Sequence, residues 1–158
     1  MFLFYQNGLL MLSDTEIMAE FVAAEAILRG HFILSSGLHS DTYLQCARVL
    51  MTPARAEKLC AALAEKLRAT IRSPVDLVVA PAMGGVVVGY EMGRQLGVDT
   101  IFCEREQGEF TLRRGFRIPQ GASVLLVEDE PVNQEVARLF LTDVGLDVAI
   151  AGNGVVAV

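Results

Sequence analysis

Cysteine and histidine are scarce in this sequence, which has three cysteines and two histidines among its 158 residues. Cys46, Cys60 and Cys103 are scattered, and no CxxC or Cys/His spacing typical of zinc ligands occurs. His31 and His39 have no carboxylate or cysteine at a recognisable spacing. The pattern argues against a zinc site and predicts reduced cysteines in a cytoplasmic protein. It favours a structural role for the histidines.

Basic residues are also few, with 13 Lys and Arg against 19 Asp and Glu and a formal net charge of −6. They do not form a stripe, which argues against a nucleic-acid partner, although a local basic loop could hold a phosphate. The apolar start, residues 1–12, is too short to span a bilayer and lacks the basic leader of a signal peptide. We therefore expect residues 1–12 to be an N-terminal extension, with the true start at Met1 or Met11, and we expect no membrane partner.

The composition is that of a globular protein, with 53% hydrophobic and 20% charged residues and enough length for one sizeable core. Ser13 or Asp14 can cap a helix that runs to about Leu28 and is ended by Gly30. Residues 31–50 alternate around a Ser-Gly turn, which predicts a β-hairpin or two short strands. A second helix is expected from Pro53 to about Arg72.

The clearest unit is DLVVAPAMGGVVVGYEMGRQLG, residues 76–97. It predicts a buried strand, a tight turn and a helix stopped by Gly97, in that order: residues 77–80, 81–85 and 86–96. Further strands are expected at 100–103, 124–127 and 148–150, a loop or ribbon at 104–121, and a helix at 131–144. Strands alternating with helices predict an α/β fold with a mainly parallel sheet flanked by helices. Ligands should bind beyond the carboxyl ends of its strands.

The turn Ala80–Gly85 is the first candidate for chemistry. Small residues after a buried strand let backbone N–H groups approach an anion, and the following helix N-terminus adds a favourable dipole. The alternative is a tight turn that needs glycine for packing alone.

Arginines form the second candidate. Arg105, Arg113 and Arg114 flank a glycine-bearing loop and could grip a polyphosphate. The alternative is a solvated ribbon of balanced charge, because glutamates are interleaved with them.

An acidic pair, Glu128 and Asp129, is the third candidate. Two carboxylates at a strand end can hold Mg²⁺, accept sugar hydroxyls or stabilise a nearby cation. The alternative is a helix start with Asp129 as its cap.

Four segments together carry a resemblance: ILRGHFILSSGLHSDTYLQCARVL, DLVVAPAMGGVVVGYEMGRQLGV, IFCERE and FTLRRGF. In this order and spacing, from about Leu28 to Asp129, they resemble orotate phosphoribosyltransferases. The resemblance implies a type I phosphoribosyltransferase-like body over residues 13–129, with a small N-terminal helix and hairpin hood. It implies Mg²⁺ as cofactor and a homodimer in which a loop of one subunit reaches into the other's site. The implied reaction joins orotate to the ribose of phosphoribosyl pyrophosphate, giving orotidine monophosphate and pyrophosphate in pyrimidine nucleotide synthesis.

The resemblance also assigns residues to parts of one site. The pyrophosphate-side loop would be formed by Ala82, Met83, Gly84 and Gly85. The phosphate grip and the mobile cover after it would use Arg105, Arg113 and Arg114. Residues near the orotate would be Ser36, Gly37, Tyr43 and Leu44. The catalytic carboxylates beneath the ribose hydroxyls would be Glu128 and Asp129.

One stretch departs from the family pattern. In that family the acidic pair is followed by a small-residue loop, typically Thr-Thr-Gly, that cradles the 5′-phosphate. Here residues 130–134 read Glu-Pro-Val-Asn-Gln. Glu130 adds negative charge where a dianion should bind, and Pro131 lacks an N–H donor. The departure predicts impaired binding of the 5′-phosphate. Ser35 and Gly84 also stand where some members of the family have lysines.

The tail, residues 124–158, carries a second resemblance, to the start of a response-regulator receiver domain. There the pair at Glu128 and Asp129 would hold Mg²⁺ for aspartyl phosphorylation, but this sequence stops before the strand that would bear the acceptor. We expect the strand, helix and strand of the tail to complete the same domain as the body. Three functions stay open: a transferase, impaired or not, a receiver-like signalling module, and a folded but inert chimera.

Overall fold

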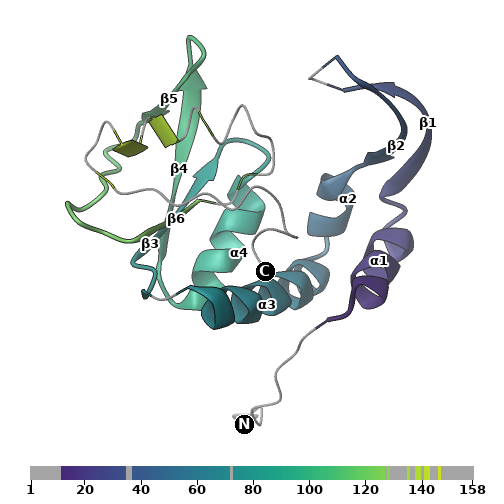
Figure 1. The fold of residues 1–158 in the computed structure, drawn as a ribbon, viewed down its shortest axis with the longest axis horizontal. Coiled ribbons are helices and arrows are strands. Elements are labelled where there is room, and N and C mark those ends of the chain that lie inside the picture. Colours follow the sequence, from purple (N-terminus) through teal and green to yellow (C-terminus); the bar gives the residue numbers. More distant parts are fainter. Residues whose placement is uncertain are drawn as a thin grey trace, which may run out of the picture.

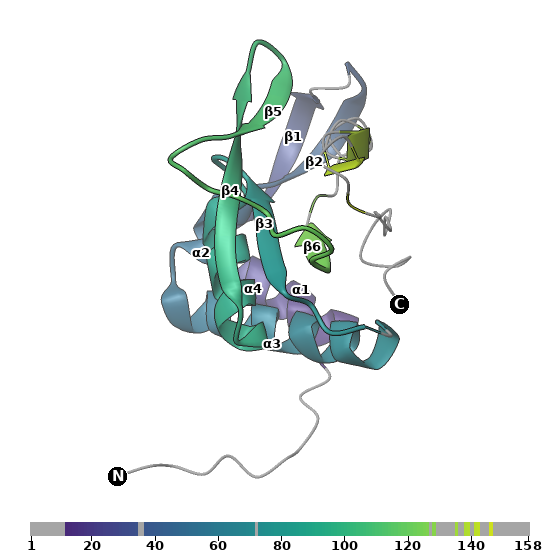
Figure 2. The same cartoon turned by 90° about the vertical axis from the view of Figure 1, so that its left-hand side faces the viewer.

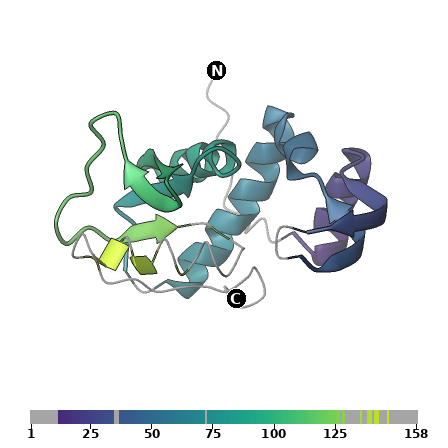
Figure 3. The ribbon, with the colours of Figure 1, turned by 90° about the horizontal axis from the view of Figure 1, so that it is seen from above.

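The structure is a computed structural model, and it describes residues 12–34, 37–71, 73–126, 128, 135, 138–139, 141–142 and 146. Within these residues the chain forms two sheets, one of two strands and one of four. Figure 1 shows the two-stranded sheet beside α1 and α2, and the four-stranded sheet beside α4. Seen from above in Figure 3, α3 lies between these two parts. The helix predicted at 131–144 and the strand at 148–150 fall mostly or wholly outside the described residues.

The N-terminal part begins with α1, Asp14–Ala23. The Ser13 hydroxyl accepts from the Glu16 N–H, and the Glu16 carboxylate accepts from the Ser13 N–H, which is a complete capping box. The predicted helix end near Leu28 was wrong. Glu25 adopts a left-handed φ of 50°, the Glu25 N–H donates to the Val22 carbonyl, and the next N–H donates to the Phe21 carbonyl. This is a Schellman ending built without glycine.

The predicted hairpin is present as the antiparallel pair β1, Ile27–Ile33, and β2, His39–Leu44. The stretch after it was predicted as strand and is instead a short helix, α2, Cys46–Leu50. Arg48 donates to the Glu25 carbonyl at 2.7 Å, and the Val49 side chain is buried. These contacts fold α2 back against the end of α1. We call α1, β1, β2 and α2 together the hood.

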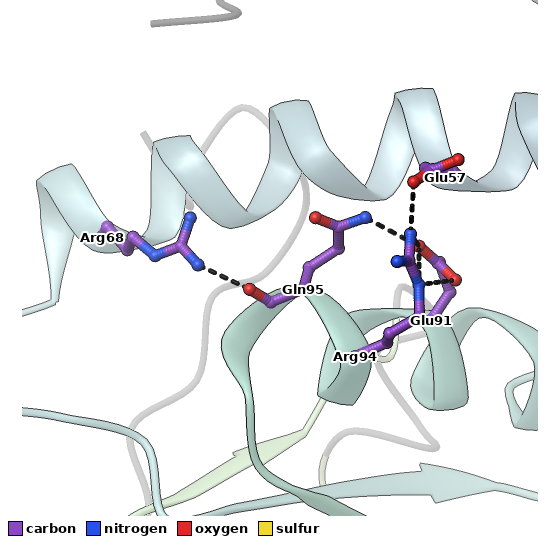
Figure 4. Close-up of polar contacts among 5 residues, drawn as sticks. All are labelled: Glu57, Arg68, Glu91, Arg94 and Gln95. Carbon is purple, nitrogen blue, oxygen red and sulfur yellow. Dashed lines mark hydrogen bonds and ion pairs between the residues drawn. The ribbon is translucent and has the colours of Figure 1, made fainter. Parts of the chain in front are cut away.

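The long helix α3, Pro53–Thr70, starts with proline at its first turn, as predicted. Ion pairs join it to the helices on either side. Glu20 of α1 accepts from Lys58 at 2.5 Å and Arg55 at 3.1 Å, and these bonds, led by that from Lys58, lower the pKa of the Glu20 carboxyl. On the other side α3 contacts α4, Val86–Leu96, through bonds that Figure 4 shows: Arg94 to Glu57, and Arg68 to the Gln95 carbonyl.

The four-stranded sheet has the order β5-β4-β3-β6. The two central strands, β3 (Leu77–Pro81) and β4 (Asp99–Glu106), are parallel, and β3 is also parallel to β6 (Val124–Leu126). β5, Glu109–Leu112, runs antiparallel to β4 and turns the polar excursion into a ribbon. β4 is therefore longer than the predicted strand at 100–103. Figure 2 shows this ribbon and the hood hairpin projecting toward the same end of the molecule.

The core lies on both faces of this sheet. One face packs against α3 and α4 through Cys60, Ala64, Leu67, Val78 and Met92. The other face is centred on Val79, Ile101, Cys103 and Phe110, with Phe116 and Ile118 of the following segment packed on it. Burial raises the pKa of the Cys60 and Cys103 thiols to about 11 each. Two of the three cysteines are thus core residues. None of the described helices is long and apolar enough to span a membrane.

Two glycines let α4 lie directly on the sheet. A Cβ atom at Gly89 would stand 2.5 Å from the Ala80 Cβ, and one at Gly93 would stand 2.0 Å from the Thr100 hydroxyl oxygen. The helix ends at Gly97, whose φ of 74° gives the left-handed cap that the sequence predicted. This close packing fixes the N-terminus of α4 at the carboxyl end of β3.

Candidate functional site

The carboxyl ends of β3 and β6 lie side by side. Val79 pairs with Leu126 in the parallel register, and Glu128 follows two residues later. A cavity of about 800 Å³ opens beyond these strand ends, and its wall includes Gly84 and Glu128. A glycine turn after one strand and a carboxylate after its neighbour therefore share one cavity.

The turn after β3 has one glycine that packing requires and one that the described residues leave open. The Gly85 N–H donates to the Pro81 carbonyl at 2.9 Å, and a Cβ at Gly85 would stand 2.8 Å from that same oxygen. A Cβ at Gly84 would meet no atom of the described residues within 4 Å. The Ala82 N–H donates to the Cys103 carbonyl, and the peptide bond that follows Ala82 is cis. Gly85 thus closes the turn, and Gly84 leaves its backbone accessible.

Helix α4 begins immediately after this turn, and among the described residues its N-cap, Gly85, has no side-chain capping hydrogen bond. N–H groups at the start of a helix lack intrahelical partners, and the helix dipole is positive there. Ala82, Gly84 and Gly85 all line the cavity, so this helix start lies at the cavity wall. The arrangement favours an anionic group next to the turn.

The hood and α3 supply the rest of the wall, and sequence reasoning did not place them there. Apolar side chains from three helices line it, among them Phe21, Val49 and Leu63. Two further charged residues, Asp14 and Lys66, also line it. The spacing of Ile17 and Phe21 on one face of α1 was the available signal for the apolar part. No motif marks Lys66.

Arg105 lies at the carboxyl end of β4, with its guanidinium carbon 4.9 Å from the centre of the Phe110 ring. The pKa of the Cys103 thiol is raised mainly by burial, and also by the charge of Glu128, while Arg105 opposes this shift. Both charges therefore act on the same strand end. Arg105 is not among the residues that line the cavity, but it lies on β4, the strand next to β3 and its glycine turn.

Arg113 and Arg114 follow β5 and both face the same carboxylate. Arg114 donates to Glu104 at 2.9 Å, and the Arg113 Nε lies 3.7 Å from the other oxygen of that group. Both arginine side chains are more than half exposed. The ribbon is thus partly charge-balanced, as the alternative interpretation expected, and neither arginine is among the residues that line the cavity.

Four predicted site residues lie apart from the cavity wall: Gly37, Tyr43 and Leu44 of the hairpin, and Met83 of the turn after β3. Gly37 adopts a φ of 80° in the turn between β1 and β2, where its N–H donates to the Leu34 carbonyl. Tyr43 and Leu44 end β2 and are partly exposed, and Met83 is 86% exposed. None of these four lines the cavity. Ser36 and Asp129 lie outside the described residues.

Curated proteins similar to this one match three quarters of the chain. No protein-family model matches it. It is 61% identical over 118 residues to an orotate phosphoribosyltransferase of Erythrobacter litoralis, a match that covers 75% of this chain and 61% of that protein. A second orotate phosphoribosyltransferase, from Sphingopyxis alaskensis, is also 61% identical over 118 residues, and the match covers 60% of it. The chain thus spans about three fifths of the curated relatives that it matches.

Solved structures agree with this assignment at the level of the fold. Leishmania donovani UMP synthase superimposes with a TM-score of 0.61 at 19% identity, over 75% of this chain and 25% of that one. Orotate phosphoribosyltransferase from Aeropyrum pernix gives 0.51 at 23% identity, over 70% of this chain and 62% of that one. The predicted type I phosphoribosyltransferase-like α/β fold is confirmed. Over three quarters of its length, therefore, this chain is homologous to orotate phosphoribosyltransferases.

Proposed function

We propose that the cavity is the active site of an orotate phosphoribosyltransferase, which joins orotate to the ribose of phosphoribosyl pyrophosphate and releases pyrophosphate. The observation that carries the proposal is the shared cavity of Gly84, Gly85 and Glu128. The homology to proteins of that name supports it. Because the chain spans about 61% of the first of these relatives, their complete activity is a proposal for this chain.

The geometry matches the charges that develop in such a transfer. Breaking the bond between ribose and pyrophosphate leaves positive charge on the sugar ring and negative charge on the leaving group. A carboxylate at Glu128 stabilises the ring, and the open start of α4 stabilises the pyrophosphate. Arg105, at the end of the adjacent strand, adds a cation on the phosphate side.

Magnesium fits this site as an ion that the substrate brings. Among the described residues no group of three or more His, Cys, Asp or Glu is placed to hold a metal. Mg²⁺ is usually held by one or two carboxylates together with substrate phosphates and water. Glu128 provides such a carboxylate, and the ion would neutralise phosphate charge.

A homodimer is the proposed assembly, and α4 offers a surface for it. Met83, Val87 and Tyr90 follow at helical spacing on and just before α4 and are 86%, 51% and 70% exposed. Large apolar side chains that gather on one face mark protein contacts more often than isolated ones do. A second copy packed here would lie against the turn that precedes α4, as the resemblance implies for a shared active site.

Two features of the tail are proposals: the altered 5′-phosphate loop and the receiver-like segment. Residues 130–134, where the 5′-phosphate cradle is replaced, and most of the receiver-like segment at 124–158 lie outside the described residues. We propose that the altered stretch weakens binding of the 5′-phosphate by adding a like charge and removing an N–H donor. The cytoplasmic location stays a prediction from the cysteine pattern.

The test is turnover of orotate by the purified chain. With orotate, phosphoribosyl pyrophosphate and Mg²⁺ together, we expect loss of orotate absorbance that stops when any one of the three is left out. If calorimetry shows binding of phosphoribosyl pyrophosphate without turnover, the site is right and the transferase is impaired. If neither binding nor turnover occurs, the proposed function is wrong. Labelling by acetyl phosphate in that case would favour the receiver-like alternative.

A further inference from the structure

The two histidines of the chain, which the transferase site does not use, meet on the hood hairpin. The His31 Nε2 and the His39 Nδ1 are 2.7 Å apart, and the ring centroids are 4.8 Å apart. Both residues are exposed. A neutral imidazole has one N–H and one lone pair, so one ring donates to the other. The hairpin thus presents two imidazole nitrogens side by side at the surface.

A bulge in the hairpin brings them together. Arg29 pairs with Thr42 and Phe32 pairs with Ser40, so two residues of β1, Gly30 and His31, stand opposite a single residue of β2. Such a bulge bends the strand and re-aims the side chain that it carries. His39, paired with Ile33 near the turn, is then within reach across the strands. Because the partners come from different strands, their separation of eight residues resembles no linear metal motif.

We propose that His31 and His39 form a binding site for a borderline divalent cation such as Zn²⁺, Ni²⁺ or Cu²⁺. Neutral imidazole is a preferred ligand of these ions. Two Zn–N bonds of about 2.0–2.1 Å at a tetrahedral angle hold the nitrogens about 3.3 Å apart. The observed separation of 2.7 Å is close to this value, so small ring rotations suffice. To bind the ion, the ring that donates in this hydrogen bond would carry its proton on its other nitrogen instead, so that both rings stay neutral and each offers one lone pair to the ion.

The site is a two-ligand surface site that water completes. No group of three or more His, Cys, Asp or Glu is placed to hold a metal in the described part of the chain, so we assign only the two imidazoles. The cation would cross-link β1 and β2 and therefore stabilise the folded hairpin by mass action.

The test is a calorimetric titration with Zn²⁺ and, separately, with Ni²⁺. It uses a Cys46→Ser background, which removes the exposed thiol as a competing ligand. We expect one ion per chain. His31→Gln and His39→Gln should each weaken binding at least about tenfold, since loss of even an outer partner of a ligand costs that much. Ile33→Gln, at an exposed position of the same hairpin, is the matched control and should bind as the parent does.

Nuclear magnetic resonance provides a second readout that does not depend on the substitutions. With only two histidines in the chain, both imidazole signals can be assigned, and the ion should shift both at the same molar ratio. Binding that persists in both histidine variants, or an ion that shifts one ring alone, would overturn the proposal. So would the absence of binding at neutral pH. Neither readout depends on orotate turnover, so this inference and the proposed function can fail separately.

Discussion

Replacement of Gly93 by alanine is expected to lower the free energy of unfolding by about 2 kcal/mol, although alanine is the better helix former. The new methyl group would stand 2.0 Å from the Thr100 hydroxyl oxygen and 2.9 Å from the Val98 carbonyl. Rotation of the Thr100 side chain would break its hydrogen bond to the Gly89 carbonyl. It would not relieve the contact between the new methyl group and the Val98 carbonyl. Helix α4 must therefore move off the sheet. Urea unfolding followed by circular dichroism measures the loss.

Gly84→Ala is the matched control, because the same methyl group would meet no atom within 4 Å in the part of the chain that the structure describes. Its free energy of unfolding should stay within about 0.5 kcal/mol of the parent. Equal stabilities for Gly93→Ala and the parent would show that α4 does not pack on β4 as closely as described. A loss in Gly84→Ala as large as that in Gly93→Ala would contradict the contrast between a packed and an open glycine.

Substitution of Glu128 by glutamine is expected to lower kcat/KM for orotate transfer about 100-fold, the usual effect of removing one group that stabilises transition-state charge. The amide keeps the size of the side chain and removes the negative charge that we propose faces the sugar. Steady-state rates with varied phosphoribosyl pyrophosphate measure the effect. Most of the loss should appear in kcat, because the charge on the ring develops only during the reaction.

Glu57→Gln is the control for Glu128→Gln. It removes a carboxylate from the side of α3 next to α4, where Glu57 pairs with Arg94 and does not line the cavity (Figure 4). Its rate should stay close to that of the parent. A Glu128→Gln protein that folds normally and keeps its rate within about threefold would exclude Glu128 from the chemistry, since a transition-state charge contact is worth far more.

Local signals in the sequence predicted the centre of the fold well. The bounds of α4 were predicted at 86–96 and are observed at Val86–Leu96, because an apolar stripe ends at a glycine that can adopt a left-handed φ. The parallel pairing of β3 with β4 follows from two apolar strands joined by helix α4, and the parallel pairing of β3 with β6 agrees with the mainly parallel sheet that was predicted. Sequence alone therefore placed the turn at 81–85 correctly, and Glu128 is the described residue of the predicted acidic pair that lines the same cavity.

The hood was harder to predict, because tertiary contacts decide its structure. Glu25 ends α1 in a conformation that usually signals glycine, so no local cue marked the end of the helix. Helix α2 forms where Val49 is buried and Arg48 reaches the backbone of residue 25, which no pattern within 31–50 revealed. For the same reason the apolar wall that the hood gives the cavity, including Phe21, could not be assigned from motifs.

The most direct test of the account is to locate phosphoribosyl pyrophosphate on the protein. Backbone amide signals of the labelled chain should be recorded by nuclear magnetic resonance while the compound is added with Mg²⁺. We predict that the largest shifts fall at residues 82–85, at the first turn of α4 and at Glu128. Shifts confined to surfaces away from the cavity, or none at millimolar ligand, would contradict the claim that the glycine turn and this carboxylate form one site.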